Sequence, residues 1–233
     1  MKYVIITGAS RGLGFRIAEV FASSSHPLLL AARNYDNLIE ARDRLKSIKT
    51  ASDIRIFPAD LSERDNINAL LGYIDKENIE IDCLINNAGI YAYKPFDETS
   101  QDEIIATINL NLTAVILLTH GIIPRMLNNG GGKIINISSD VGKSAIKNMS
   151  PYVASKFGIM GFSRAIKKEY HGKNLYVSTV CPGIINNNEI NEKDIDKGML
   201  SPSKIAQTVY YIYKNSENIN FDEVELHPIM QDY

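Results

Sequence analysis

Cysteines and metal-binding motifs are scarce in this chain. The 233 residues include two cysteines, Cys83 and Cys181, far apart and each inside an apolar segment. This placement is typical of buried, reduced thiols and favours the cytoplasm over an oxidising compartment. There is no CxxC or HExxH motif and the four histidines are scattered, so we expect no metal site.

Long apolar runs and basic clusters are missing as well. The longest apolar runs, such as AVILL at 114–118, are far short of the about 20 residues that a membrane span needs. The opening segment MKYVIITGAS is too briefly apolar for a signal peptide. The net charge of −2 and the absence of a basic run argue against a nucleic-acid partner. We therefore expect a cytoplasmic protein without a membrane or nucleic-acid partner.

The chain is rich in short apolar runs that alternate with amphipathic stretches. Strands are expected at 2–7, 27–32, 53–59, 81–89, 133–138, 175–180 and 223–227. Helices are expected at 11–24, 34–49, 62–77, 99–127, 150–171 and 202–214. The strands are continuously apolar, which indicates a parallel sheet covered on both faces. The pattern predicts an α/β fold, a doubly wound parallel sheet of the Rossmann type, as a single domain over residues 1–233.

The first predicted turn carries the segment TGASRGLG. It places Gly8, Gly12 and Gly14 between the first strand and the first helix. Glycines there let the backbone approach a pyrophosphate, and the N–H groups of the helix N-terminus receive its charge. A bare turn or tight packing would also use glycine, but the strand before and the helix after favour a nucleotide site.

Several motifs in order resemble those of the short-chain dehydrogenase/reductase family, and in particular its 3-oxoacyl carrier-protein reductases. The similar segments are TGASRGLG at 7–14, NNAG at 86–89, NLNLTA at 109–114, NISS at 136–139, YVASK at 152–156 and PG at 182–183. Together they cover most of the chain. The resemblance implies an oxidoreductase that uses a nicotinamide cofactor.

Two tyrosines have a lysine four residues later, and the sequence must distinguish them. Tyr152 precedes Lys156 and Tyr210 precedes Lys214, and one helical turn puts each pair on one helix face. Ser139 ends a predicted strand thirteen residues before Tyr152, whereas Tyr210 follows no such strand. We therefore predict that Tyr152 and Lys156 form the site and that the second pair is structural.

Carbonyl reduction explains why these residue types are needed. Tyr152 would donate the proton, and Lys156 would lower the tyrosine pKa from its usual value of about 10. Ser139 would hydrogen-bond the carbonyl oxygen, with Ser138 as its rival. By resemblance, Lys156 also holds the nicotinamide ribose, and Asn111 binds a water that links Lys156 to solvent. Asn109 is the alternative to Asn111.

The resemblance also assigns the cofactor contacts. Besides Tyr152 and Lys156, they are Gly8, Ser10, Arg11, Gly12, Leu13, Gly14, Arg33, Asp60, Leu61, Asn87, Ala88, Gly89, Pro182, Gly183, Ile185 and Asn187. Asp60 either meets the adenine ring or is a plain N-cap. Asn187 stands where the family usually has a threonine.

NADPH is expected to be preferred over NADH. NAD-preferring sites usually carry an acid after the second strand, but this chain has Arg33 there. Arg11 lies inside the glycine loop, and two guanidinium groups suit a ribose 2′-phosphate. Asp36 is the nearest acid, several residues late.

The expected function is NADPH-dependent reduction of a ketone or aldehyde, or the reverse alcohol oxidation. The alternatives are a 3-oxoacyl carrier-protein reductase and a cofactor-binding regulator without turnover. In the resembling reductases basic residues at the ends of two long helices steer the acidic carrier; here these ends carry Asn128, Asn129 and Lys173. By resemblance the protein is a homodimer or homotetramer with a small-molecule substrate.

Overall fold

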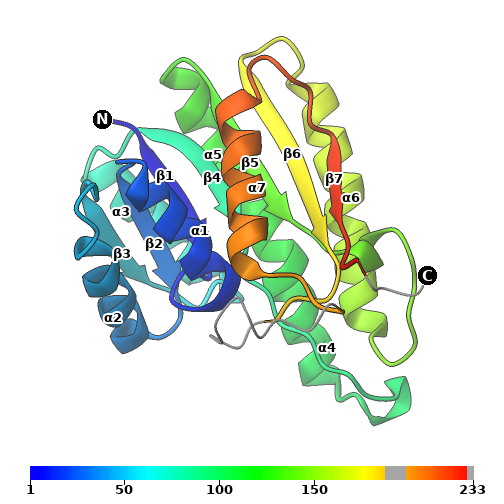
Figure 1. The fold of residues 1–233 in the computed structure, drawn as a ribbon. Coiled ribbons are helices and arrows are strands. Elements are labelled where there is room, and N and C mark those ends of the chain that lie inside the picture. The colour runs from blue at the N-terminus through cyan, green and yellow to red at the C-terminus, as the bar shows by residue number, and fades with distance from the viewer. Residues whose placement is uncertain (187–197, 230–233) are drawn as a thin grey trace.

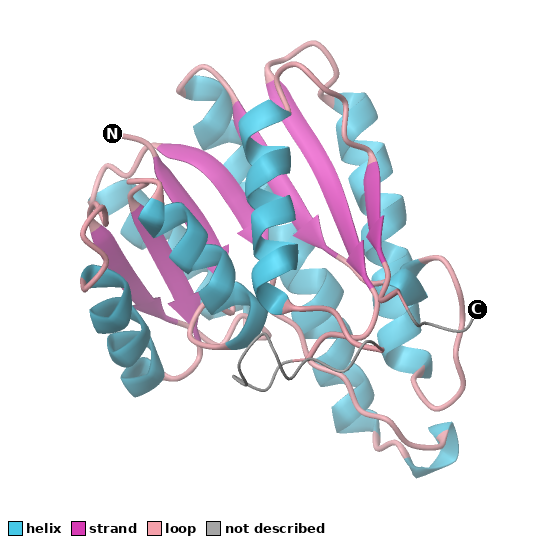
Figure 2. Ribbon diagram, in the orientation of Figure 1, coloured by secondary structure: helices cyan, strands magenta, loops and turns pink. Residues whose placement is uncertain are grey.

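One parallel sheet of seven strands forms the centre of the computed structural model, which describes residues 1–186 and 198–229 (Figures 1 and 2). The strand order is β3-β2-β1-β4-β5-β6-β7, and every neighbouring pair is parallel. The strands are β1 Tyr3–Thr7, β2 Leu28–Ala32, β3 Ile54–Pro58, β4 Ile81–Asn86, β5 Gly132–Ile137, β6 Leu175–Pro182 and β7 Glu223–Leu226. The predicted single α/β domain with a doubly wound sheet is confirmed.

Helices cover both faces of this sheet. They are α1 Gly12–Ser23, α2 Tyr35–Lys46, α3 Arg64–Lys76, α4 Gln101–Ile108, α5 Ala114–Asn128, α6 Ser150–Glu169 and α7 Pro202–Asn215. Residues of α1, α2 and α7 share one apolar core with the sheet, and residues of α3 and α5 share the other (Figure 1). Strands β1 and β2 are accordingly buried at every position, and apart from Thr7 at the end of β1 their residues are apolar or aromatic.

The helical region expected at 99–127 is not a uniform α-helix. A π-helical segment, η2 (Asn109–Thr113), separates α4 from α5. Such widened turns occur often at functional sites. Two short 3₁₀ turns, η1 (Phe96–Glu98) and η3 (Asp140–Gly142), were not expected from the sequence because neither has a repeating apolar pattern.

By length and composition alone, the continuous helical stretch Gln101–Asn128 is apolar enough to cross a membrane, with a mean hydropathy of 1.6 in its most apolar window. The length of uninterrupted apolar runs did not predict this property, because polar but uncharged residues divide the stretch into short runs while its average hydropathy stays high. Core helices pass the same test, and Leu118, Ile122 and Met126 pack into the core beneath the sheet. The stretch therefore has a buried face that the fold explains and an outer face that includes the exposed Ile105.

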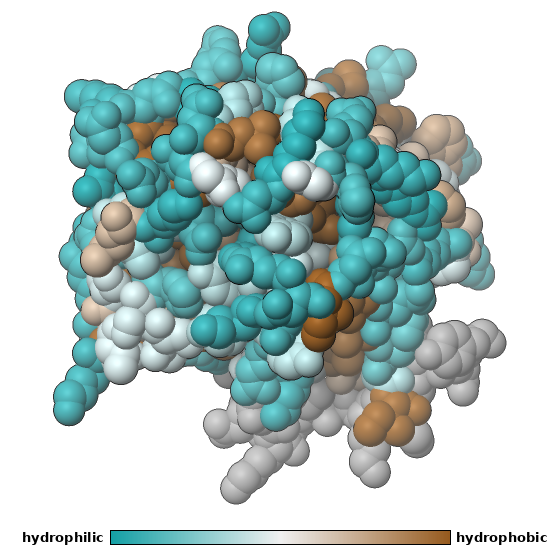
Figure 3. Space-filling model, turned by 90° about the horizontal axis from the view of Figure 1, so that it is seen from above, coloured by the Kyte–Doolittle hydropathy of each residue, from teal (hydrophilic) through white to brown (hydrophobic). Residues whose placement is uncertain are grey.

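The order of the strands fixes where a ligand can bind. The chain passes from β3 at one edge back to β4 beside β1, so the order reverses between β1 and β4. Ligands of such sheets bind at the carboxyl ends of the strands at this switch point. The opposite end of the molecule, where the strands begin, is mostly hydrophilic with isolated apolar side chains (Figure 3).

Candidate active site

The glycine-rich turn after β1 has the backbone that a dinucleotide site needs. Gly8 and Gly12 have φ values of +65° and +56°, in the left-handed region that favours glycine. A Cβ on Gly14 would lie 2.3 Å from the carbonyl oxygen of Gly8, so a side chain there would displace the turn. Ser10 lies in the turn and Leu13 is buried beneath it. No side chain caps the N-terminus of α1, and its N–H groups suit a pyrophosphate.

Thr7, at the end of β1, ties this turn to the segment after β4. Its hydroxyl oxygen accepts hydrogen bonds from the backbone N–H groups of Asn87, at 2.9 Å, and Ala88, at 3.0 Å. The Asn87 side chain donates in return to the carbonyl oxygen of Thr7 at 2.9 Å. Thr7 was missed because no predicted motif gave it a role. It places the predicted cofactor residues Asn87, Ala88 and Gly89 beside the glycine turn.

A buried amide network supports the floor of the site. Asn86 donates to Asn136 at 2.8 Å and to Thr119 at 3.2 Å, and Asn136 donates to Ser163 at 2.8 Å. Asn86 and Asn136 are paired near the ends of neighbouring strands, so this chain of bonds joins β4 and β5 to α5 and α6. Asn86 is thus a buried structural residue. Fully satisfied buried polar networks of this kind fix one arrangement of the elements around them.

Asn111 occupies the π-helical turn between α4 and α5. It is fully buried, whereas Asn109 is partly exposed. Its side chain accepts from the N–H of Ile90 at 2.9 Å and donates to the carbonyl oxygen of Ile90 at 2.8 Å and to Ser155 at 3.2 Å. A Cβ on Gly89 would lie 3.3 Å from Asn111 Oδ1 and 3.9 Å from Lys156 Nζ. These distances place Asn111 in the same small region as the lysine.

The two serines at the end of β5 have different partners. Ser138 donates to the backbone carbonyl of Lys156 at 3.3 Å and so holds α6 against the strand. Ser139 faces the phenol of Tyr152, and its hydrogen bond lowers the tyrosine pKa. It also donates to Asp140 Oδ1 at 2.9 Å. Ser139 is therefore the serine that lies beside Tyr152, the predicted proton donor.

Tyr152 and Lys156 lie one turn apart near the start of α6. The Lys156 Nζ atom is 5.4 Å from the Tyr152 ring centroid and donates to the carbonyl oxygen of Ile137 at 2.9 Å. Burial lowers the pKa of Lys156 to about 8. The pKa of Tyr152 is raised, mainly by burial and further by the charge of Asp140. The pKa of Tyr152 is thus raised and not lowered as expected, because burial outweighs the hydrogen bond from Ser139.

The adenosine end of the predicted site carries both arginines on the surface. Arg11 and Arg33 are exposed, and Arg33 Nη1 lies 3.7 Å from Asp60 Oδ2. Asp60 Oδ1 accepts from the N–H of Ser62 at 3.1 Å and from its hydroxyl at 2.6 Å. Asp60 thus closes a turn before α3, whose N-cap is Glu63. The N-cap interpretation of Asp60 is therefore wrong, and Leu61 is buried beside it.

The nicotinamide end follows β6. Pro182 ends this strand, and the N–H of Gly183 donates to the carbonyl oxygen of Leu226 at 2.8 Å. Ile185 forms an isolated parallel bridge with Leu200. Asn187, predicted to replace the usual threonine, lies outside the described residues. Within residues 1–186 and 198–229, no group of His, Cys, Asp and Glu is arranged to hold a metal ion.

Comparison with known proteins agrees with this geometry. The model of the short chain dehydrogenase family matches residues 2–197. A 3-oxoacyl-[acyl-carrier-protein] reductase from Chlamydia trachomatis is 33% identical over 222 residues, which cover 91% of this chain and 89% of that protein. Ketoacyl reductase HetN from Nostoc sp. is 32% identical over 223 residues, which cover 92% and 76% of the two chains.

A solved structure shares the whole fold. The alcohol dehydrogenase from the archaeon Thermococcus sibiricus, complexed with 5-hydroxy-NADP, has a TM-score of 0.90 and 25% identity, over 100% of this chain and 99% of that one. The chain belongs to the short-chain dehydrogenase/reductase family. It is an NAD(P)-dependent oxidoreductase that acts on a carbonyl or alcohol group.

Proposed function

We propose that this protein reduces a ketone or aldehyde with NADPH, or catalyses the reverse oxidation, at a site made of Ser139, Tyr152, Lys156 and Asn111. The observation that carries the proposal is the contact of Ser139 with Tyr152, next to a buried lysine, at the carboxyl end of the sheet. The glycine turn of the dinucleotide site opens at the same end. The proton donor and the bound cofactor would therefore lie next to each other at the carboxyl end of the sheet.

Each residue has a role that its position supports. A bound nicotinamide dinucleotide supplies the hydride. Tyr152, protonated at neutral pH, donates to the carbonyl oxygen, and Ser139 holds that oxygen by a hydrogen bond. Lys156, with a pKa of about 8, carries its charge over most of the physiological range. Asn111 keeps the loop at Ile90 and Ser155 in place beside the lysine and binds the water that leads to solvent.

Preference for NADPH over NADH rests on the two exposed arginines. Arg11 and Arg33 stand where a ribose 2′-phosphate needs positive charge, and no acid follows β2 directly. We expect Arg33→Asp to weaken NADPH binding at least tenfold and to leave NADH binding similar or better. Arg42→Asp, on the far part of α2, is the matched control. Equal affinity of the parent protein for both cofactors, measured by fluorescence titration, would exclude this preference.

A carrier-protein substrate is the second candidate, because a relative at 33% identity has that name. The ends of the two long helices, where the resembling reductases carry the basic residues that steer the carrier, do not support this candidate. A helix that follows a parallel strand runs back along it, so α5 and α6 end where β5 and β6 begin, away from the site (Figure 1). There Arg125 pairs with Asp75 and Lys133 with Glu217. We therefore expect a free thioester to be reduced about as well as its carrier-bound form.

Turnover separates the enzyme from a regulator that only binds cofactor. Oxidation of NADPH by a panel of ketones, aldehydes and short 3-oxoacyl thioesters is the direct test. Turnover of any panel member that disappears in Tyr152→Phe supports the proposal. Tight NADPH binding with no turnover of the whole panel would favour the regulator.

We also propose a homodimer or homotetramer and a cytoplasmic location. The outer faces of α4 and α6 expose Ile105 and Phe157, side chains that a second copy would cover. Buried reduced cysteines suit the cytoplasm. A monomer by light scattering at micromolar concentration would contradict the assembly.

A further inference from the structure

A tyrosine in the loop after β4 is open to solvent beside the proposed proton donor. Tyr91 is 65% exposed. Its ring centroid is 5.8 Å from that of Tyr152, and the two ring planes are inclined at 60°. This separation is within the range of about 4.5–7 Å at which aromatic rings attract each other. The Tyr91 ring thus contacts Tyr152 and still leaves most of its own surface uncovered.

The backbone on both sides of this exposed ring is fixed. Asn111 binds Ile90 twice, accepting from its N–H at 2.9 Å and donating to its carbonyl oxygen at 2.8 Å. On the other side, the N–H of Lys94 donates to the carbonyl oxygen of Asn148 at 2.9 Å. A surface that is held in place before binding loses little conformational freedom when a ligand arrives. The loop after β4 therefore presents Tyr91 as a preformed wall.

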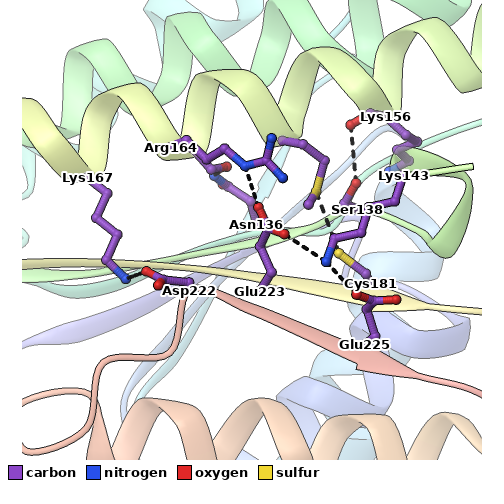
Figure 4. A network of polar contacts seen from close by, with 12 residues as sticks. Asn136, Ser138, Lys143, Lys156, Arg164, Lys167, Cys181, Asp222, Glu223 and Glu225 are labelled. Atoms are coloured by element: carbon purple, nitrogen blue, oxygen red, sulfur yellow. Dashed lines mark hydrogen bonds and ion pairs between the residues drawn. The ribbon is translucent and has the colours of Figure 1, made fainter.

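The loop after β5, which accepts the bond from Lys94, is anchored as well. Lys143 Nζ is 2.7 Å from Glu223 Oε2 and also bonds Glu225, and both acids belong to the edge strand β7 (Figure 4). The other anchor is the carbonyl group of Asn148. Between these two points the loop carries Ile146, which is 44% exposed. This loop is therefore held at both ends and has an exposed apolar side chain between them.

A third exposed apolar side chain follows β6. Ile184 is 58% exposed, and its carbonyl oxygen accepts from the N–H of Leu200 at 2.7 Å. Because β4, β5 and β6 are neighbours in the sheet, their following loops start side by side at the end that holds Tyr152. Single exposed apolar side chains are common on protein surfaces. Three of them on fixed loops after consecutive strands match the mostly apolar walls of small-molecule sites.

We propose that Tyr91 is a specificity-determining residue, and that the site takes ketones or aldehydes with an aromatic ring attached to the carbonyl carbon. The Tyr91 ring packs against the aromatic group of the substrate, and Ile146 and Ile184 supply apolar surface at the same end of the sheet. The inference rests on the proposed function, because the carbonyl oxygen must lie at Tyr152 for its substituent to reach Tyr91.

The test compares three methyl ketones that differ in one substituent: acetophenone, cyclohexyl methyl ketone and butanone. The readout is the ratio of kcat/KM between variant and parent for each ketone, so that differences in intrinsic reactivity cancel. Tyr91→Ala should lower kcat/KM roughly tenfold for acetophenone, less for the cyclohexyl ketone, and less than about twofold for butanone. Tyr91→Phe keeps the ring and should behave like the parent. Tyr211→Ala, which removes an exposed ring of α7, should change none of the three.

Binding to a protein without turnover separates this inference from the proposed function. Tyr152→Phe keeps the neighbouring ring, and ligand-observed NMR gives the Kd of acetophenone for this variant loaded with NADPH. Addition of Tyr91→Ala should weaken that Kd roughly tenfold. If the parent reduces none of the three ketones but the Kd shifts in this way, the proposed reduction fails and the aromatic subsite stands.

Three results would overturn the inference. The first is an equal loss of kcat/KM for all three ketones in Tyr91→Ala, since the ring would then not discriminate between substituents. The second is acetophenone that does not bind, or whose Kd does not depend on Tyr91. The third is dissociation of an oligomer into monomers in Tyr91→Ala, measured by light scattering, which would show that a second copy of the chain covers the ring.

Discussion

The pairs Tyr152–Lys156 and Tyr210–Lys214 have the same spacing and each lies on an α-helix. They differ in the burial of the lysine and in the neighbours of the tyrosine. In the first pair Lys156 is 5% exposed and Tyr152 faces Ser139 and Asp140 at the carboxyl end of the sheet. In the second, Lys214 is exposed and Tyr210 packs its ring against the core. The i,i+4 spacing therefore carries no chemistry by itself. The buried lysine and the neighbouring serine are what distinguish the first pair from the second.

Tyr210 of the second pair belongs to an aromatic cluster between α1 and α7. The Tyr210 ring packs edge-on against Phe21, with centroids 5.1 Å apart, and beside His26 and Tyr213. Tyr213 in turn donates to Asp82 through its hydroxyl. These contacts join α7 to α1 and to the beginning of β4. Tyr210 thus packs within the fold, whereas Tyr152 lies in the proposed site.

Removal of each lysine should give the largest difference between the pairs. We expect Lys156→Met to lower kcat/KM for carbonyl reduction by roughly 10²-fold or more, the usual scale of general acid–base catalysis. The protein should still fold, because methionine suits a buried site and avoids the cost of burying a charge. Lys214→Met should leave kcat/KM unchanged, and steady-state kinetics checks both. Equal losses in the two variants would break the comparison.

Truncation of the second tyrosine should affect stability and not activity. Tyr210→Ala removes a half-buried ring, and we expect the free energy of unfolding to fall by about 2 kcal/mol, less than the ~3–5 kcal/mol of a fully buried aromatic. Tyr211→Ala is the control and should cost less, because Tyr211 is 56% exposed. Urea denaturation measures both. The idea fails if Tyr210→Ala lowers kcat/KM of the folded protein.

The smallest of the expected effects is a pH dependence of the stability, which comes from His26 in the aromatic cluster. Burial lowers the pKa of His26 below its ordinary 6.5, against the opposing charge of Asp82. The unfolded chain therefore binds this proton more readily, so the contribution of His26 is complete above pH 6.5 and is lost as the pH falls.

The matched variant for this effect is His26→Phe, which keeps a ring but cannot titrate. We expect its melting temperature to fall less between pH 7.5 and pH 5 than that of the parent protein, measured by circular dichroism. The pH profile of kcat/KM should be the same in both proteins. Identical losses of melting temperature would show that His26 makes no such contribution.

The sequence predicted the fold well because the fold depends on the periodicity of apolar residues and on the turn residues between the elements. Apolar runs such as β1 and β2 are buried on both faces, and the glycine turn follows β1 as expected. The pair Ser139 and Tyr152 was predicted from order along the chain, and the structure brings the two together. The cofactor preference and Asn187 remain predictions, the latter because it lies outside the described residues.

What the sequence could not predict depends on contacts between distant segments. Thr7 holds the loop after β4 from 80 residues away, and Lys143 reaches Glu225 across 82 residues. The raised pKa of Tyr152 was missed for the same reason, since burial is not visible in the spacing of Tyr152 and Lys156. Asp140 is next to Ser139 in the chain, but the hydrogen bond that its carboxylate accepts from the serine hydroxyl is visible only in the structure.

The central claim is that Tyr152 is the proton donor and Tyr210 is not. The most direct test compares Tyr152→Phe with Tyr210→Phe, each of which removes one hydroxyl and keeps the ring, by following NADPH oxidation with a carbonyl substrate of the parent protein. We expect Tyr152→Phe to fold, to bind NADPH and to lose turnover by roughly 10²-fold or more, while Tyr210→Phe keeps it. Turnover that survives in Tyr152→Phe, or that is lost in Tyr210→Phe instead, would contradict the account.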